Sequence, residues 1–88
     1  MQTQEKEKRV KRLIYQSFYR GCKETDIILG KFAKKYLYQL DDSEVDIFEK
    51  LLEENDNDIF SWVSGKAPYP DWVEGKIRNL LEKFDFSK

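Results

Sequence analysis

The stretch YRGCKETDIILGKF, residues 19–32, brings an arginine, a glycine and a glutamate together just ahead of an apolar run. A guanidinium donates to carboxylates and carbonyls, a glycine lets another backbone approach closely, and a carboxylate accepts hydrogen bonds from a partner. The same residues also have structural roles. Arg20 would favour the negative end of a first helix, Gly21 would end it, and Glu24 would suit the positive end of a second. The residue types alone leave both a helix junction and a recognition surface open.

Composition excludes most enzyme chemistry. The chain has 88 residues, no histidine and a single cysteine, Cys22. Without histidine there are no imidazole metal ligands, no histidine-dependent nucleophiles and no histidine general base. A chain of this size buries only about 60 to 65% of its unfolded surface, which argues against a deep catalytic cavity. One cysteine without zinc-site spacing is typical of a reducing compartment. We expect a protein that is not an enzyme.

Charge is divided along the chain. Residues 1–40 hold ten Lys and Arg against four Asp and Glu, whereas residues 41–88 hold six against thirteen. This asymmetry permits a dipolar contact with a partner without identifying it. The net charge of -1 and the lack of recognition motifs argue against nucleic-acid binding. No stretch approaches the roughly 20 apolar residues of a membrane span, and Glu5 and Glu7 are not typical of a targeting peptide, so we expect no membrane insertion.

Helical spacing of apolar residues predicts two helices before residue 41. The first runs from about Glu5 to Arg20. The second follows Gly21 and reaches Leu40 without a proline or a β-type alternation. The apolar positions that define them are Val10, Leu13, Ile14 and Phe18, then Ile28, Leu29, Phe32, Tyr36, Leu37 and Leu40.

Capping residues predict two further helices. Asp41 and Glu44 form a capping box ahead of an apolar run that extends to Leu52. Asp56 is placed to cap a short fourth helix, and Gly65 is placed to end it in a left-handed conformation.

A fifth helix is predicted after the linker APYP, from about Trp72 to Phe84. Asp71 and Glu74 would form its capping box. The predicted fold is an all-α bundle of about five helices with short connections, forming one domain over residues 1–88.

The run Arg20-Gly21-Cys22-Lys23-Glu24-Thr25-Asp26, followed by IILGKF, resembles the RGxxE signature of small assembly factors that promote covalent flavin attachment to succinate dehydrogenase. Three further stretches are similar to that family: RLIYQSFYRG, LDDSEVDIFEKLLEENDNDIFSW and GKAPYP. The resemblance covers residues 12–70, and its form looks closest to the alphaproteobacterial and mitochondrial branch.

The resemblance implies a non-enzymatic chaperone. Such a protein binds the flavoprotein subunit of succinate dehydrogenase, and in some bacteria of fumarate reductase, while FAD becomes bonded to a histidine there. Arg20, Gly21 and Glu24 match the motif, Asp26 is a neighbour in the same patch, and Tyr19 flanks it. We expect these five residues to bind the partner. The resemblance assigns no catalytic, cofactor-binding or metal-binding residue to this chain, and the FAD concerned belongs to the flavoprotein.

Two other interpretations remain open at this stage. A generic helical adaptor unrelated to flavin fits the composition equally well, and nucleic-acid binding through the basic first half fits it least. We also expect a monomer located in the bacterial cytoplasm or, alternatively, in the mitochondrial matrix.

Overall fold

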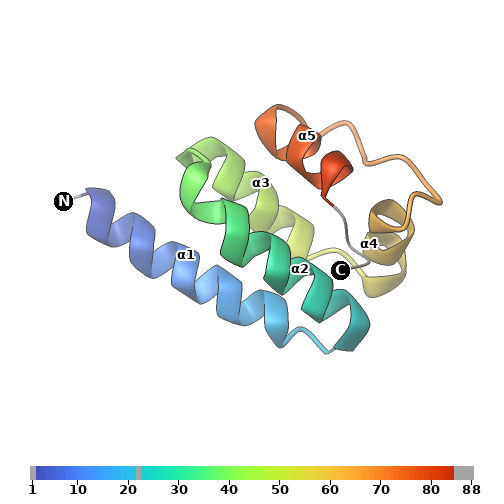
Figure 1. Cartoon of the computed structure of the whole chain (residues 1–88), viewed down its shortest axis with the longest axis horizontal. Helices are drawn as coiled ribbons and strands as arrows, with labels where there is room; N and C mark the ends of the chain where they lie inside the picture. Colours follow the sequence, from blue (N-terminus) through green and yellow to red (C-terminus); the bar gives the residue numbers. More distant parts are fainter. Residues whose placement is uncertain (1, 22, 85–88) are drawn as a thin grey trace.

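The computed structural model describes residues 2–21 and 23–84, with side chains for all of these except residues 2–4 and 23. Cys22, which was assigned no role, lies outside them. The described residues form five α-helices, one short 3₁₀ helix and no strand, which confirms the predicted all-α fold. The elements are α1 (Gln2–Phe18), α2 (Lys23–Tyr36), η1 (Leu37–Gln39), α3 (Asp42–Leu52), α4 (Asp56–Val63) and α5 (Lys76–Lys83) (Figure 1).

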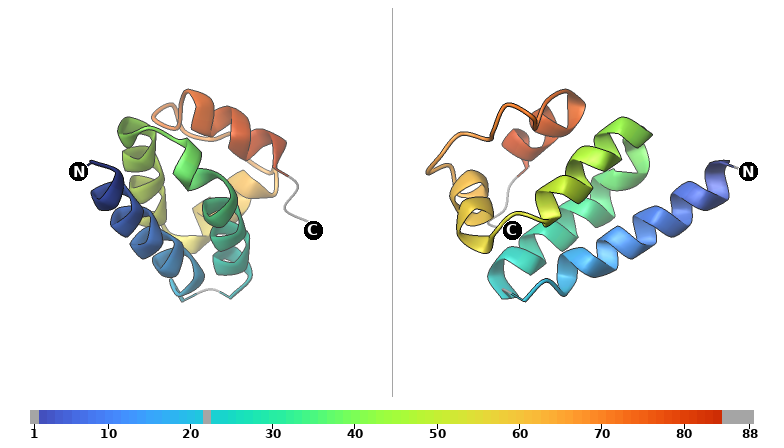
Figure 2. Two further views of the ribbon diagram at one scale, coloured as in Figure 1. Left: turned by 60° about the vertical axis from the view of Figure 1, so that its left-hand side comes forward. Right: turned by 180° about the vertical axis from the view of Figure 1, so that it is seen from behind.

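The helices form a bundle in which α1 and α2 lie side by side and run in opposite directions (Figure 1). α3 packs against α1 and also contacts α5, while α4 contacts α2. Seen from behind, the turn between α1 and α2 lies at the same end of the bundle as the connection between α3 and α4 (Figure 2). Two junctions far apart in the sequence are therefore neighbours in space.

The core collects apolar side chains from every α-helix and from η1. Phe32 and Phe48 stack at its centre, with ring centroids 5.9 Å apart. Trp62 and Trp72 are partly buried and pack against the core, in an edge-to-face pair whose centroids are 6.4 Å apart. The buried apolar residues are Val10, Leu13, Leu29, Phe32, Ala33, Leu37, Leu40, Val45, Phe48, Leu51, Ile59, Tyr69, Val73, Ile77 and Leu81.

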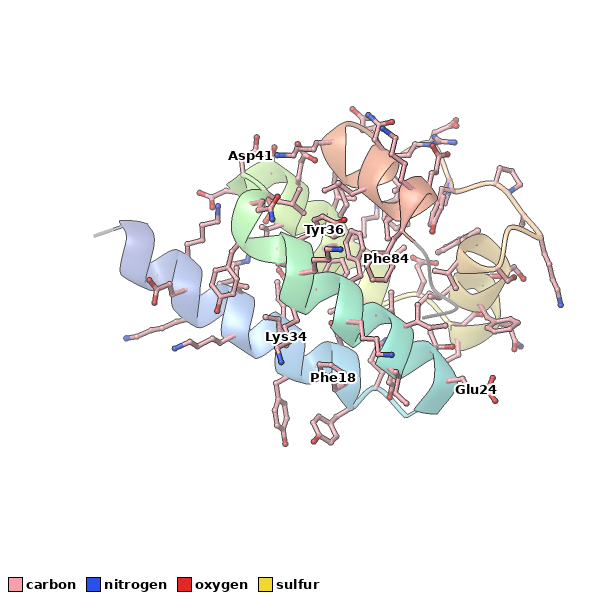
Figure 3. All side chains as sticks on the ribbon, in the orientation of Figure 1. Phe18, Glu24, Lys34, Tyr36, Asp41 and Phe84 are labelled. Carbon is pink, nitrogen blue, oxygen red and sulfur yellow. The ribbon has the colours of Figure 1, made fainter. Side chains whose placement is uncertain are left out.

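A glycine inside α2 lets α1 and α2 approach closely. A β-carbon built on Gly30 would lie 2.5 Å from three atoms of the Phe18 ring, far inside van der Waals contact. Phe18 lies between the two helices (Figure 3). The helical cost of an interior glycine is therefore offset by the aromatic side chain that it accommodates.

The predicted cap of α3 is confirmed. The Asp41 carboxylate accepts from the Glu44 N–H at 3.1 Å. This hydrogen bond and one from the Ser43 hydroxyl lower the pKa of Asp41. The Glu44 carboxylate completes a different contact, because its Oε1 accepts from the Ile77 N–H at 2.5 Å. Glu44 thus caps α5, a helix that begins 32 residues further along the chain.

The predicted cap of α4 is wrong by one residue. Asn55 is the N-cap, and its side-chain oxygen accepts from the Asp58 N–H at 2.8 Å. Asp56 is the first residue of the helix, which leaves its carboxylate available for another contact. Gly65 follows the C-cap residue Ser64 with a φ of 82°, which confirms the predicted left-handed end.

The predicted start of the fifth helix is also wrong, because α5 begins at Lys76. Residues 71–75 form turns in which the Val73 N–H donates to the Pro70 carbonyl at 3.0 Å and the Val73 side chain is fully buried. Gly75 is the N-cap, and its φ of 79° is not helical, so no helix can continue through this residue from Trp72. Since Glu44 supplies the cap from another helix, the local box DWVE is not needed.

Candidate partner-binding site

The turn between α1 and α2, together with the first turn of α2, carries all five residues that we expected to bind a partner. α1 ends at Phe18, and the Tyr19 N–H donates to the Gln16 carbonyl at 3.2 Å, which closes the last turn of the helix. Gly21 has a φ of 129°, a conformation that residues with a β-carbon rarely adopt. Glu24 and Asp26 lie in the first turn of α2, as predicted.

Arg20 caps a helix, but not the helix that the sequence suggested. Its Nε donates to the Leu52 carbonyl at 3.0 Å, and its Nη2 donates to the Glu54 carbonyl at 2.7 Å. Leu52 is the last residue of α3, where carbonyls lack partners within the helix and a cation is favoured. The prediction that Arg20 acts on the end of α1 is therefore wrong.

Two carboxylates neutralise Arg20. Its Nη1 donates to the carboxylate of Asp56 at the start of α4, and Asp26 Oδ1 lies 3.8 Å from the same nitrogen. The side chains of Arg20 and Asp26 are only 11% and 5% exposed. Attraction between opposite charges is stronger where water is excluded. Arg20 therefore ties the α1–α2 turn to the α3–α4 connection.

Asp26 also fixes the backbone of the turn. Its Oδ2 accepts from the Gly21 N–H at 2.8 Å, which gives this buried carboxylate a second favourable contact. The other side of Gly21 is open, since a β-carbon there would meet nothing within 4 Å. The turn is held from the inside and its backbone is accessible from the outside.

The remaining two predicted site residues face solvent. Tyr19 is 70% exposed, and its ring packs at a tilt against that of Tyr15, which is 65% exposed, with centroids 4.6 Å apart. Glu24 lies at the start of α2 and points away from the bundle (Figure 3). Adjacent exposed aromatic rings are a feature of protein-binding surfaces. The turn thus combines an accessible layer, formed by Tyr19, Gly21 and Glu24, with a buried layer beneath it.

Sequence reasoning missed several residues of this arrangement. Asp56 was interpreted only as a cap, and the carbonyls of Leu52 and Glu54 carry no sequence signal, because they are backbone atoms more than 30 residues from Arg20. Tyr15 could have been found, since a residue four positions before Tyr19 lies on the same helix face.

Comparison with known proteins identifies the family. The family described as "Flavinator of succinate dehydrogenase" matches residues 11–85. The chain belongs to this family. The match includes the whole of the α1–α2 turn and the α3–α4 connection to which Arg20 binds, so the resemblance inferred from the RGxxE signature is confirmed.

Similar curated proteins carry the name "Succinate dehydrogenase assembly factor 2, mitochondrial". The one from Scheffersomyces stipitis is 43% identical over 76 residues, covering 82% of this chain and 51% of the relative. The one from Lodderomyces elongisporus is 46% identical over 76 residues, covering 82% and 46%. The one from Saccharomyces cerevisiae is 40% identical over 86 residues, covering 93% and 53%. The chain spans about half the length of these relatives. No solved structure gives a significant match.

A hollow of about 390 Å³ lies between α4, α5 and the segment that joins them. Tyr69 lines it and is 7% exposed. Burial raises the pKa of Tyr69, and its hydroxyl has no hydrogen-bond partner among the described residues. This is a cost to stability, because a buried polar group that loses water without gaining a partner is disfavoured.

The described part of the chain shows neither a metal cluster nor a membrane span. Within residues 2–21 and 23–84, no three acidic or cysteine side chains come together to hold a metal ion. None of the helices described there is both long and apolar enough to cross a bilayer.

Proposed function

We propose that this chain binds the flavoprotein subunit of succinate dehydrogenase and promotes the covalent attachment of FAD to it. The observation that carries the proposal is membership of the flavinator family over residues 11–85, a span that contains the complete α1–α2 turn. The names of the relatives, which describe assembly factors of succinate dehydrogenase, support it. The chain acts as an assembly factor and not as an enzyme, and it binds no FAD of its own.

The chain contributes orientation in this proposal. It has no histidine to accept a flavin, which is consistent with a bond that forms on a histidine of the partner. A bond-forming step accelerates strongly when the reacting atoms are held in near-attack geometry. A small rigid bundle that docks beside the flavin site can stabilise that geometry, while the reactivity belongs to the cofactor and its host protein.

The five predicted residues have two different roles in this proposal. Tyr19, Gly21 and Glu24 make direct contact, because they are exposed and the Gly21 backbone is open to close approach. Arg20 and Asp26 were expected to touch the partner as well. Their burial favours a positioning role, in which they hold the turn against the α3–α4 connection.

The proposal extends to clients, assembly and location. The flavoprotein subunit of fumarate reductase is a second client in bacteria that contain it, and the free chain is a monomer. We place the protein in the bacterial cytoplasm, with the mitochondrial matrix as the alternative. The matched relatives are named mitochondrial, which supports the alternative.

The direct test mixes the purified chain with apo-flavoprotein subunit and FAD. After denaturing electrophoresis, flavin fluorescence in the gel measures covalent attachment. We expect the fluorescent band of the flavoprotein subunit to appear faster with the chain than without it. Equal rates with and without the chain, together with no detectable complex, would favour the generic helical adaptor instead.

A further inference from the structure

A groove lies beside the α1–α2 turn. It has a volume of about 410 Å³ and lies between the second half of α1 and the end of α3. Half-buried Leu52 contributes apolar surface to it. The residues that line it are Tyr15, Gln16, Tyr19, Arg20, Glu49, Leu52 and Glu53.

The aromatic side of the groove offers an accessible π face. Tyr15 and Tyr19 are 65% and 70% exposed, and their rings lie against each other at 4.6 Å with planes 33° apart. Because each ring already contacts the other on one side, a guest meets an outer face. The negative face of a tyrosine ring attracts a cation within about 6 Å of its centroid.

The opposite side of the groove is acidic. Glu53 is exposed, and its carboxylate makes no hydrogen bond or ion pair with any other described residue. Glu49 is already occupied, since its Oε1 accepts from Arg9 at 2.8 Å. Arg20 adds no free positive charge, because its donors bind two carbonyls and the Asp56 carboxylate. One unpaired carboxylate therefore lines the same groove as one exposed aromatic pair.

We infer that this groove binds an arginine side chain of the flavoprotein subunit. A planar guanidinium stacks on a tyrosine ring with one face while its edge donates to a carboxylate, a combination that lysine cannot reproduce. The aliphatic stem of the arginine covers Leu52. This inference rests on the proposed function and deepens it, because it names the partner chemistry recognised next to the RGxxE turn.

The site is testable without loss of the fold, because Tyr15 and Glu53 are exposed. We would measure the dissociation constant for the purified apo-flavoprotein subunit with the wild-type chain and three variants. Tyr15→Leu and Glu53→Gln should each weaken binding about two- to fivefold. Tyr15→Phe, which keeps the π face, should bind like the wild type. Glu53→Gln should also flatten the dependence of affinity on salt.

Matched controls on other surfaces separate a local effect from a general one. Tyr38, 44% exposed and just beyond α2, and Glu74, exposed before α5, lie outside the groove. Tyr38→Leu and Glu74→Gln should leave the affinity unchanged. Thermal unfolding should give the same melting temperature for all of these variants.

A charge exchange identifies the guest. Glu53→Arg should weaken binding about tenfold or more, and changing one surface arginine of the flavoprotein subunit to glutamate should restore it. Rescue only by changing a lysine would overturn the assignment to arginine. Wild-type affinity in both Tyr15→Leu and Glu53→Gln would overturn the groove and leave the proposed function intact. A wild-type chain that neither binds the subunit nor raises flavin attachment would overturn the proposed function itself.

Discussion

Replacing Arg20 by alanine should destabilise the fold far more than the loss of a surface charge. The substitution removes the donors to the Leu52 and Glu54 carbonyls and leaves Asp26, 5% exposed, without its cation. Breaking a buried ion pair by removing one partner costs about 3 to 5 kcal/mol. The total free energy of unfolding of a domain of this size is roughly 4 to 13 kcal/mol. We therefore expect a melting temperature at least about 12 °C below that of the wild type.

Two variants calibrate this expectation. Arg20→Lys keeps the charge but not the planar fork, so it should lose an intermediate amount of stability. Arg12→Ala is the matched control on α1, since Arg12 is 59% exposed and its Nη2 lies 3.7 Å from Glu49. An exposed pair of this kind is worth about 0 to 1 kcal/mol. Thermal and urea unfolding, followed by circular dichroism, measure all three variants.

The same experiment separates a structural role of Arg20 from direct contact. Below its lowered melting temperature, the Arg20→Ala chain should stimulate flavin attachment less than the wild type does. The loss should follow the unfolded fraction of the chain and the loosening of the α1–α2 turn. An Arg20→Ala chain with a melting temperature within about 2 °C of the wild type would refute the reasoning. Arg20 would then act mainly on the partner, as the motif alone suggested.

Three further perturbations test other contacts of the fold. Gly30→Ala should destabilise by about 1 to 3 kcal/mol in urea unfolding, because its methyl group meets the Phe18 ring, and Phe18→Leu should recover part of that loss in a double-mutant cycle. Tyr69→Phe should unfold at a urea concentration equal to or higher than that of the wild type, because it removes a buried hydroxyl without a hydrogen-bond partner among the described residues. The wild type should lose stability above about pH 10, because the raised pKa of Tyr69 means that its hydroxyl ionises more readily in the unfolded chain. Tyr69→Phe should abolish this loss. The wild type should be more stable than Asp41→Asn at neutral pH, and this difference should shrink below about pH 4. The lowered pKa of Asp41 means that its capping contribution is lost only when the carboxylate is protonated. A constant difference in stability from pH 7 to pH 3 would contradict this.

Local patterns were sufficient to predict the helices. The spacing of apolar residues and the Asp41 cap depend on interactions within a few residues, and they place most ends of α1 to α4 to within about two residues. The predictions were wrong for the start of α1, which is Gln2 and not Glu5, and for the end of α2, which is Tyr36 and not Leu40, because the chain continues there as the 3₁₀ helix η1. The start of α5 could not be read in the same way. One of its N-terminal N–H groups, that of Ile77, is capped by Glu44 from another helix, so the sequence around residues 71–76 did not contain the deciding contact.

The candidate site shows the same limit. The motif and its exposed members, Tyr19 and Glu24, were predictable from residue type and family resemblance. The burial of Arg20 and Asp26 was not, because it depends on the α3–α4 connection folding against the turn. A residue pattern indicates that an arginine matters, but only the packed structure indicates which groups receive its hydrogen bonds.

The central claim is that the exposed layer of the α1–α2 turn promotes flavin attachment through contact with the flavoprotein subunit. Glu24→Ala tests it most directly, because Glu24 is exposed and its side chain supports no other described residue. The measurement is the initial rate of covalent flavin attachment, at a temperature where wild type and variant are both fully folded. We expect a melting temperature close to that of the wild type and loss of most of the stimulation. A Glu24→Ala chain that stimulates flavin attachment as well as the wild type, at limiting and at saturating concentrations, would contradict it.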